Sequence, residues 1–121
     1  MKNYKDLLVW KKAHELVLFV YKQTSTFPND EKYNLTTQIR RAATSIPTNI
    51  AEGCGRFTQR DFAQYLQVAF GSSHETEYLI FLSYELGYLS DEQYKDLHLQ
   101  VNEVKAMLIT LLNKVRRDAK I

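Results

Sequence analysis

The sequence has very little cysteine and no long hydrophobic run, and each lack excludes a class of protein. Cys54 is the single cysteine among 121 residues, so an internal disulfide framework cannot form and a reducing, cytoplasmic compartment is expected. No apolar run approaches the roughly 20 residues that span a bilayer, so we expect no membrane partner. The opening segment, MKNYKDLLVWKKAH, is interrupted by charge too often for a signal peptide.

Motifs for catalysis and for cofactors are absent as well. The Glu-x-x-His pairs of di-iron bundles do not occur, and a zinc site would need clustered Cys and His. No strand pattern precedes Ser72 and Ser73, which excludes a nucleophile elbow. Gly53-Cys54-Gly55 is too short to cradle a pyrophosphate. We therefore predict a protein that is not an enzyme, with no catalytic residue, metal, cofactor or small-molecule substrate.

What the sequence does have is the composition of one globular domain over residues 1–121. Hydrophobic residues make up 45% and charged residues 25%, and a chain of this length can bury a core without disulfides or structural metals. Residues 1–60 carry ten Lys and Arg against five Asp and Glu, whereas residues 61–121 carry six against nine. This asymmetry indicates an anionic partner or an assembly in which opposite surfaces meet; scattered solvated charge is the alternative.

Apolar residues recur at helical spacing in four segments, and no segment has a strand pattern. The first helix is expected at Leu8–Thr24, with Asp6 as its cap, and the second at about Leu35–Glu52. Thr58 opens a third helix that runs to Leu86, and a capping box at Ser90–Gln93 opens a fourth. Its apolar seam is Tyr94, Leu97, Val101, Val104, Leu108, Leu111 and Val115. The sequence therefore predicts an all-α, up-and-down antiparallel four-helix bundle.

Pro47 lies inside the second helical segment. It removes the hydrogen bond to the Ala43 carbonyl and costs about 3 kcal/mol unless the helix bends. We predict a kinked helix, with two shorter helices as the alternative. Gly53 and Gly55 are expected to supply the left-handed residues that end it.

Polar residues interrupt one stripe of the third segment. The stripe is Tyr65, Val68, Ser72, Glu75, Leu79, Leu82 and Leu86, and Gly71 beside it indicates close passage of another backbone. We expect Glu75 to meet polar residues of the second segment, within the protomer or across a subunit boundary. The predicted structural polar network is Gln38, Arg41, Ser45, Asn49, Glu52 and Glu75. If the Arg41–Glu75 pair is buried, its loss should cost several kcal/mol.

Basic residues concentrate around the first two helical segments and the turn that follows them. They are candidates for binding the phosphates of RNA or DNA, with Phe57 or a tyrosine stacking on a base. In the alternative interpretation the arginines pair with acidic residues and lie over apolar surface. The candidate nucleic-acid-binding residues are Lys11, Lys12, Arg40, Arg56 and Arg60.

Too many helix faces are apolar for a monomeric bundle. The third segment carries an aromatic surface in addition to its stripe, formed by Phe70, Tyr78, Phe81, Tyr84 and Tyr88. Monomers seldom expose large contiguous apolar patches, so we predict a homo-oligomer. A protein–protein scaffold or assembly factor without a nucleic-acid role is the alternative function.

Five motifs together resemble a known family. They are D-L-x-V-W-x-K-A-H-E-L at Asp6–Leu16, F-P-x-x-E-K-Y-x-L at Phe27–Leu35, Q-I-R-R-A-A-x-S-I-P-x-N-I-A-E-G at Gln38–Gly53, G-S-x-x-E at Gly71–Glu75 and L-G-Y-L-S at Leu86–Ser90. The chain resembles the four-helix bundle proteins encoded by intervening sequences inside bacterial 23S rRNA genes. Asn34 stands where that family tends to have glycine, and asparagine tolerates the left-handed turn expected there.

The resemblance implies a bacterial homopentamer with no catalytic residues. Similar proteins are accessory factors of diversity-generating retroelements, in which a basic ring is associated with nucleic acid. On this basis we expect a pentameric protein that binds RNA or DNA through a basic surface.

Overall fold

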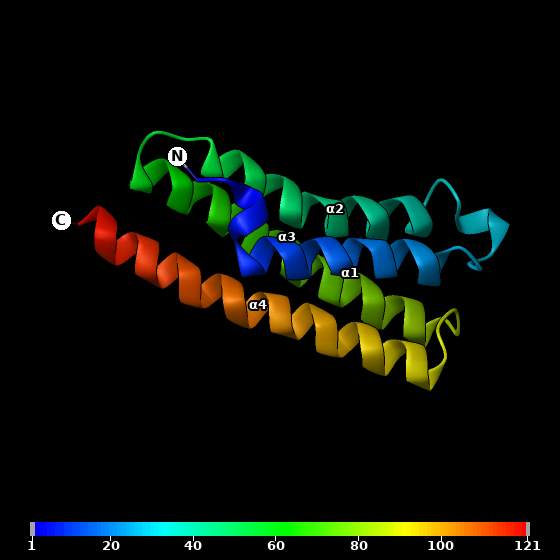
Figure 1. The fold of residues 1–121 in the computed structure, drawn as a ribbon. Coiled ribbons are helices and arrows are strands. Elements are labelled where there is room, and N and C mark those ends of the chain that lie inside the picture. The colour runs from blue at the N-terminus through cyan, green and yellow to red at the C-terminus, as the bar shows by residue number, and fades with distance from the viewer. Residues whose placement is uncertain (1, 121) are drawn as a thin grey trace.

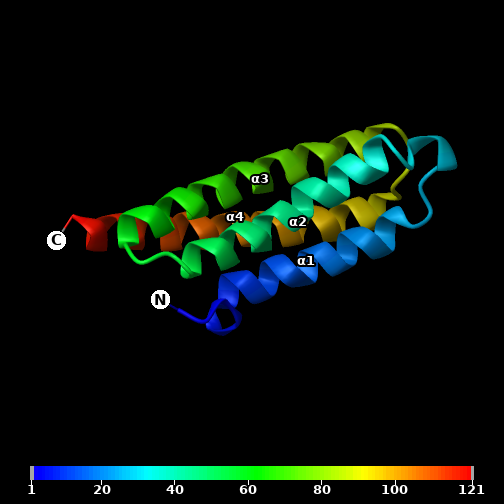
Figure 2. The same cartoon turned by 90° about the horizontal axis from the view of Figure 1, so that it is seen from above.

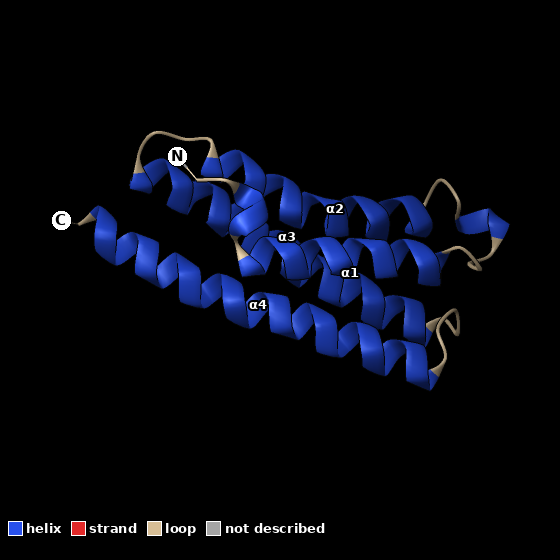
Figure 3. Ribbon diagram, viewed as in Figure 1, coloured by secondary structure: helices blue, strands red, loops and turns tan. Residues whose placement is uncertain are grey.

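Four long helices make up the fold of the computed structural model, which describes residues 2–120 and contains no strand in that range. Helix α1 spans Leu8–Thr24, α2 spans Leu35–Cys54, α3 spans Gln59–Glu85 and α4 spans Asp91–Ala119. Two 3₁₀ turns, η1 (Tyr4–Asp6) and η2 (Asn29–Glu31), precede α1 and α2. The helices alternate in direction around a common core (Figures 1 and 3). This confirms the predicted all-α class.

The alternation gives the bundle two unlike ends. The terminal end holds η1, the start of α1, the α2–α3 turn and the end of α4, so that the start of α3 lies beside the end of α4 (Figure 2). The loop end holds the α1–α2 connection and the α3–α4 turn (Figure 1). Segments far apart in the sequence therefore meet at each end.

Helix α4 follows its predicted cap and seam closely. The Ser90 hydroxyl accepts from the Gln93 amide at 3.1 Å, and the Gln93 side chain accepts from the Ser90 amide at 2.8 Å. This confirms the capping box. Near the end of the seam Leu112 is buried, whereas the predicted Leu111 is half-buried. The buried seam is Leu97, Val101, Val104, Leu108, Leu112 and Val115.

The predicted stripe of α3 is only partly correct: Leu79 is buried, and Tyr65, Ser72 and Leu82 are half-buried. Val68, Glu75 and Leu86 are exposed, and the core face lies about one residue away. That face contains Ser73, Thr76 and Ser83, whose hydroxyls donate to carbonyls of the preceding turn of α3. Because these bonds satisfy the hydroxyls locally, polar residues enter the core, and an apolar pattern cannot find them. The buried residues are Phe62, Ala63, Leu66, Ala69, Ser73, Thr76, Leu79, Ile80 and Ser83.

Helix α2 continues through Pro47 as a single helix, so the alternative of two shorter helices is wrong. Thr48 and Asn49 each donate a side-chain hydrogen bond of 2.8 Å to the carbonyl four residues earlier. Ile39, Ile46 and Ile50 are fully buried around the proline. Tertiary packing of this apolar face offsets the local cost of about 3 kcal/mol.

Left-handed backbone was predicted at Gly53, Gly55 and Asn34, and none of the three has it, although Gly55 does follow the last residue of α2. Gly53 lies inside α2, Gly55 has φ −85°, and Asn34 has φ −128°. A Cβ on Gly53 would lie 2.8 Å from the ring of Phe62, whereas a Cβ on Gly71 would meet nothing within 4 Å. Close helix packing therefore requires glycine at position 53, whereas no backbone of another segment within residues 2–120 passes close to Gly71.

Positive φ occurs elsewhere than predicted, and one of the three predicted helix caps is wrong. Gly87 in the α3–α4 turn has φ +83°, which favours glycine. Asp6 does not cap α1, because it closes the η1 turn and Leu7 takes the cap position without a side-chain bond. Thr58 does cap α3, accepting from the Asp61 amide at 3.1 Å.

Candidate nucleic-acid interface

A cationic pocket opens at the terminal end between the start of α3 and the end of α4. Its volume is about 450 Å³, and Arg60, Arg116 and Lys120 line it together with Gln64 and Gln67. Among the described residues, no aspartate or glutamate contributes to its lining. A pocket with three cations and no acid attracts anions, above all phosphates.

Local structure positions the two arginines of this cationic pocket. The Thr58 cap starts α3 at Gln59, which places Arg60 in the first helical turn. From α4, a guanidinium nitrogen of Arg116 donates to the Gln67 side-chain oxygen at 2.7 Å. An amide oxygen orients the guanidinium but leaves its charge unneutralised. Both cations therefore remain available to an external anion.

The α2–α3 turn adds an arginine and an aromatic ring close in sequence to Arg60 of the cationic pocket. The guanidinium of Arg56 lies 4.7 Å from the ring centroid of Tyr65 and donates to the Tyr65 hydroxyl. Phe57 follows it and is 90% exposed. The turn thus holds Arg56 against α3 and leaves Phe57 in solvent.

Arg40 does not belong to this surface. Its Nε donates to the Thr24 hydroxyl at 2.9 Å, and a terminal nitrogen donates to the Tyr21 carbonyl at 3.3 Å. Its guanidinium also lies 4.5 Å from the ring centroid of Tyr21. About 20 Å of helix separate it from the end of α2 at Cys54. Arg40 therefore ties down the last turn of α1 near the loop end.

The two candidate lysines of α1 are placed differently from each other. Lys12 forms a salt bridge of 3.3 Å with Glu103 of α4, in a groove that Glu15 also lines. Lys11 is exposed on α1. The acidic neighbours of Lys12 make it a poor phosphate ligand, so the five sequence candidates do not form one patch.

The predicted polar network is present only in part. Asn49 donates to the Ser45 hydroxyl at 3.0 Å, and Ser72 of α3 donates to the same oxygen at 2.9 Å. Arg41 and Glu75 line one groove of about 610 Å³, but both are exposed and residues 2–120 contain no salt bridge between them. A contact between Arg41 and Glu75 within the protomer is therefore absent among these residues, and a contact across a subunit boundary stays a prediction.

Two further members of that network lie apart from its hydrogen-bonded part. Gln38 is exposed and lines the groove between α2 and α3. Glu52 instead lines the groove beside α1, together with Trp10 and His14. The stripe from Gln38 to Glu52 advances seven residues at a time, which drifts by about 40° around a straight helix over this length. A helical projection alone hides that drift.

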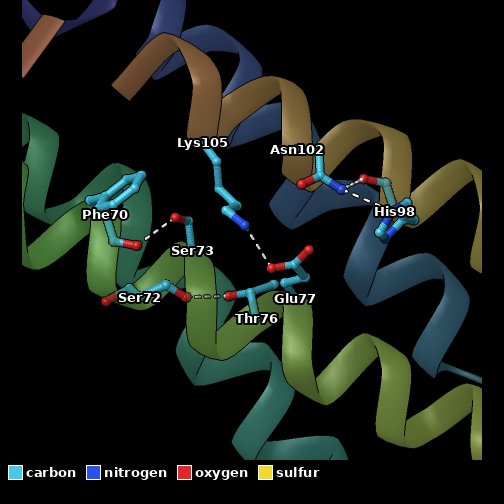
Figure 4. A network of polar contacts seen from close by, with 8 residues as sticks. All are labelled: Phe70, Ser72, Ser73, Thr76, Glu77, His98, Asn102 and Lys105. Atoms are coloured by element: carbon cyan, nitrogen blue, oxygen red, sulfur yellow. Dashed lines mark hydrogen bonds and ion pairs between the residues drawn. The ribbon is translucent and has the colours of Figure 1, made fainter. Parts of the chain in front are cut away.

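A polar cluster between α3 and α4 was not anticipated from the motifs. Lys105 donates to a Glu77 carboxylate oxygen at 2.7 Å, and Asn102 donates to the His98 carbonyl at 2.8 Å (Figure 4). The hydrogen bond from Lys105 lowers the pKa of Glu77, with burial opposing it. The sequence contained one signal for this pair: Glu77 follows the buried Thr76, and Lys105 follows the buried Val104. Positions that flank the buried seam of a helix bundle often carry ion pairs between helices.

Charge distinguishes the two ends of the bundle. The half nearer the terminal end, residues 2–15, 46–71 and 106–120, carries ten Lys and Arg against five Asp and Glu. The half nearer the loop end, residues 16–45 and 72–105, carries six against nine. Asp61 and Asp118 lie near the cationic pocket in sequence but do not line it. The bundle is therefore positive at the terminal end and negative at the loop end.

Other kinds of site find little support among residues 2–120. No group of three or more His, Cys, Asp or Glu within that range could hold a metal ion. Burial raises the pKa of the Cys54 thiol, although nearby Lys2 opposes the shift, and this disfavours the reactive thiolate. Within the same range, no helix is both long and apolar enough to cross a membrane.

These features define a class: an all-helical bundle protein with a positive end. The chain belongs to the family of 23S rRNA-intervening sequence proteins, whose model matches residues 5–110. This confirms the resemblance drawn from the five motifs.

One solved structure with this fold is a protein of unknown function from the S23 ribosomal protein family of Bacteroides thetaiotaomicron VPI-5482. It is 28% identical, and the match covers 88% of this chain and 96% of that one with a TM-score of 0.81. A comparison with curated proteins found no match.

Proposed function

We propose that this protein is a non-enzymatic, cytoplasmic homo-oligomer that binds nucleic acid through its terminal end. The observation that carries the proposal is the cationic pocket of Arg60, Arg116 and Lys120, which no acidic side chain lines among the described residues. Phosphate contacts by Lys and Arg supply most of the affinity in sequence-independent nucleic-acid binding. The family's association with rRNA genes is consistent with such a ligand.

The arginines are suited to phosphate rather than to a single small anion. A guanidinium binds phosphate oxygens through two parallel hydrogen bonds, and two arginines from different helices can contact neighbouring phosphates. Lys114 and Arg117 on the same end of α4 are exposed and extend the positive field. A phosphate backbone uses such an extended field better than an isolated ion does.

Self-association would multiply this surface. Tyr78 is 58% exposed on α3, and Val68 and Phe81 are exposed on the same helix. Arg41 and Glu75 lie in the open groove with opposite charges that a neighbouring subunit can pair. In a closed ring, rotation about one axis keeps every terminal end on the same side, so the positive ends add up. We propose that this ring is a pentamer, as the family resemblance implies.

Salt-dependent titration of RNA and DNA tests the proposal. We expect the logarithm of affinity to fall linearly with the logarithm of salt concentration, by about 0.7 per phosphate contact on a single strand. The variant R60Q/R116Q should lose affinity and lower that slope by about 1.4. The matched control K22Q/K95Q removes two exposed lysines from the negative half and should change neither. Equal effects of the two variants, or no binding at low salt, would contradict the proposal.

The assembly is tested separately by light scattering at low micromolar concentration. We expect a mass near five times the protomer mass of 14.2 kDa. A monomer mass would refute the oligomer without affecting the binding experiment. The exposed aromatic residues of α3 also favour the scaffold alternative. Recovery of one stoichiometric protein and no nucleic acid from host extract would support that function instead.

A further inference from the structure

We propose that the terminal end selects single-stranded over double-stranded nucleic acid. One unpaired base stacks on Phe57 while the cationic pocket holds the adjoining phosphates. The inference rests on the proposed function, because it assigns a strand type to the same surface. It adds a non-ionic contact that phosphate binding alone does not require.

The Phe57 side chain is almost fully exposed on a turn that backbone hydrogen bonds hold in place. It is 90% exposed, so the protomer leaves both the faces and the edges of the ring largely accessible. The turn around it is held by backbone bonds from Gly55 to Glu52 at 3.0 Å and from Arg56 to Gly53 at 3.1 Å. Thr58 caps α3 immediately afterwards. A ring in this position is a preformed stacking platform that contributes nothing to the core.

The distance from Phe57 to the basic residues that would bind phosphate suits one nucleotide and its neighbours. Arg60 follows Phe57 by three residues, so their Cα atoms lie at most about 11 Å apart. The cationic pocket continues from Arg60 to Arg116 and Lys120 on α4. Proteins that bind single strands combine aromatic platforms with such positive grooves. Inside a duplex, stacking covers the faces of the bases and pairing occupies their edges, so away from the duplex ends only an unpaired base can lie on Phe57.

Tyr33 is an internal control with nearly the same exposure. It is 86% exposed in the α1–α2 connection at the loop end. The Lys32 ammonium lies 5.4 Å from its ring centroid, and Asp30 and Glu31 are close in sequence. The negative half of the bundle repels phosphate. Exposure and one nearby cation therefore do not make a stacking site; we expect one only beside a pocket that is lined by cations and by no acidic side chain.

The experiment compares a labelled single-stranded RNA, a single-stranded DNA of the same sequence and the corresponding RNA duplex, by fluorescence anisotropy with the full chain. F57A should weaken single-strand binding about 5- to 150-fold and leave duplex binding unchanged. F57W should retain the affinity of the parent protein, and Y33A should change none of the three affinities. A fluorescent base analogue in the single strand should be quenched on binding to the parent protein but not to F57A.

The outcomes separate this inference from the proposed function. If F57A has no effect, or weakens single-strand and duplex binding equally, the stacking inference is overturned. The proposed function then survives as long as R60Q/R116Q still weakens binding. A change in assembly mass for F57A would also overturn it, because the ring would then pack against a neighbouring subunit. If F57A weakens binding to the single-stranded RNA and to the single-stranded DNA alike, the inference is supported through the chemistry that the two strands share. If F57A weakens binding to only one of them, the inference is supported and that strand is identified as the natural ligand.

Discussion

The two ends of this bundle use arginine, acid and aromatic residues for different purposes. At the loop end the charges are taken up by the structure: Glu31 accepts from the Asn34 side chain at 3.1 Å and from the Tyr88 hydroxyl at 2.9 Å. Tyr84 likewise donates to Asp91 at 2.7 Å. At the terminal end three cations face a pocket without an acidic partner among the described residues. Glu31 and Asp91 at the loop end are thus used in hydrogen bonds within the fold, whereas the pocket at the terminal end leaves three cations that can bind an anion.

Arg40 and Arg60 illustrate how the two ends use the same residue type differently. Both lie in the basic half of the sequence, residues 1–60, yet Arg40 hydrogen-bonds to the last turn of α1 and Arg60 lines an open pocket. A cation whose donors are used internally stabilises the fold, whereas a cation without an acidic neighbour can bind an anion. The partners of a basic residue therefore indicate its role better than its charge does.

We expect the substitution with the greatest effect to be Gly53→Ala, which forces α2 away from α3 at the terminal end. In Gly53→Ala the new Cβ would lie 2.8 Å from the Phe62 ring and 2.9 Å from the Tyr65 Cβ. We expect destabilisation by about 1–3 kcal/mol from overpacking. Gly71→Ala is the control, because open space at a helical glycine predicts a gain of about 0.5–1 kcal/mol. Urea unfolding measures both; equal effects would mean that the close approach at Gly53 is absent.

The next largest effect is expected from substituting each of the two arginines in turn. Arg40→Gln should destabilise the protein by about 1–2 kcal/mol, because it removes two hydrogen bonds and the contact with the Tyr21 ring. Its affinity for nucleic acid should be unchanged. Arg60→Gln should do the reverse, with unchanged unfolding and weaker binding. Denaturation and binding curves on both variants check this, and weaker binding by Arg40→Gln would remove the distinction between the ends.

The smallest effect concerns the Glu77–Lys105 pair midway between the ends. The folded protein lowers the pKa of Glu77 from its ordinary 4.5, so the stabilisation is present above that pH and is lost as pH falls through the lowered pKa. Glu77→Gln should cost about 1 kcal/mol or less at pH 7, since the pair is partly exposed.

Chemical denaturation at several pH values measures the Glu77 effect. The difference between the parent and Glu77→Gln should disappear below the lowered pKa. Glu103→Gln, which breaks the more exposed pair with Lys12, is the control and should show no measurable change. A constant difference across the acid range would contradict the assigned role of Glu77.

Local signals were sufficient to predict most of the fold. The bounds of α1 agree with the sequence prediction, and the Ser90 capping box occurs as expected, because spacing and caps depend on neighbouring residues. The face of α3 was not predictable in this way. Its core contains Ser73, Thr76 and Ser83, which an apolar pattern treats as surface residues.

The candidate site was predictable only in its first half. Arg56, Phe57 and Arg60 lie close together in the sequence, so their shared turn could be recognised from it. Arg116 and Lys120 are more than fifty residues further on and join Arg60 only through the antiparallel return of α4. In the sequence their charge is explained by the favourable position of cations at a helix C-terminus. Topology alone brings the two halves together.

We propose that nucleic acid contacts the terminal end and not the loop end. Hydrogen exchange of the full chain, with and without a single-stranded RNA at low salt, distinguishes the two ends. We expect added protection in the α2–α3 turn, the first turns of α3 and the last turns of α4, with no change in the α1–α2 connection or the α3–α4 turn. Protection centred on the loop end, or none at RNA concentrations that saturate binding, would contradict it.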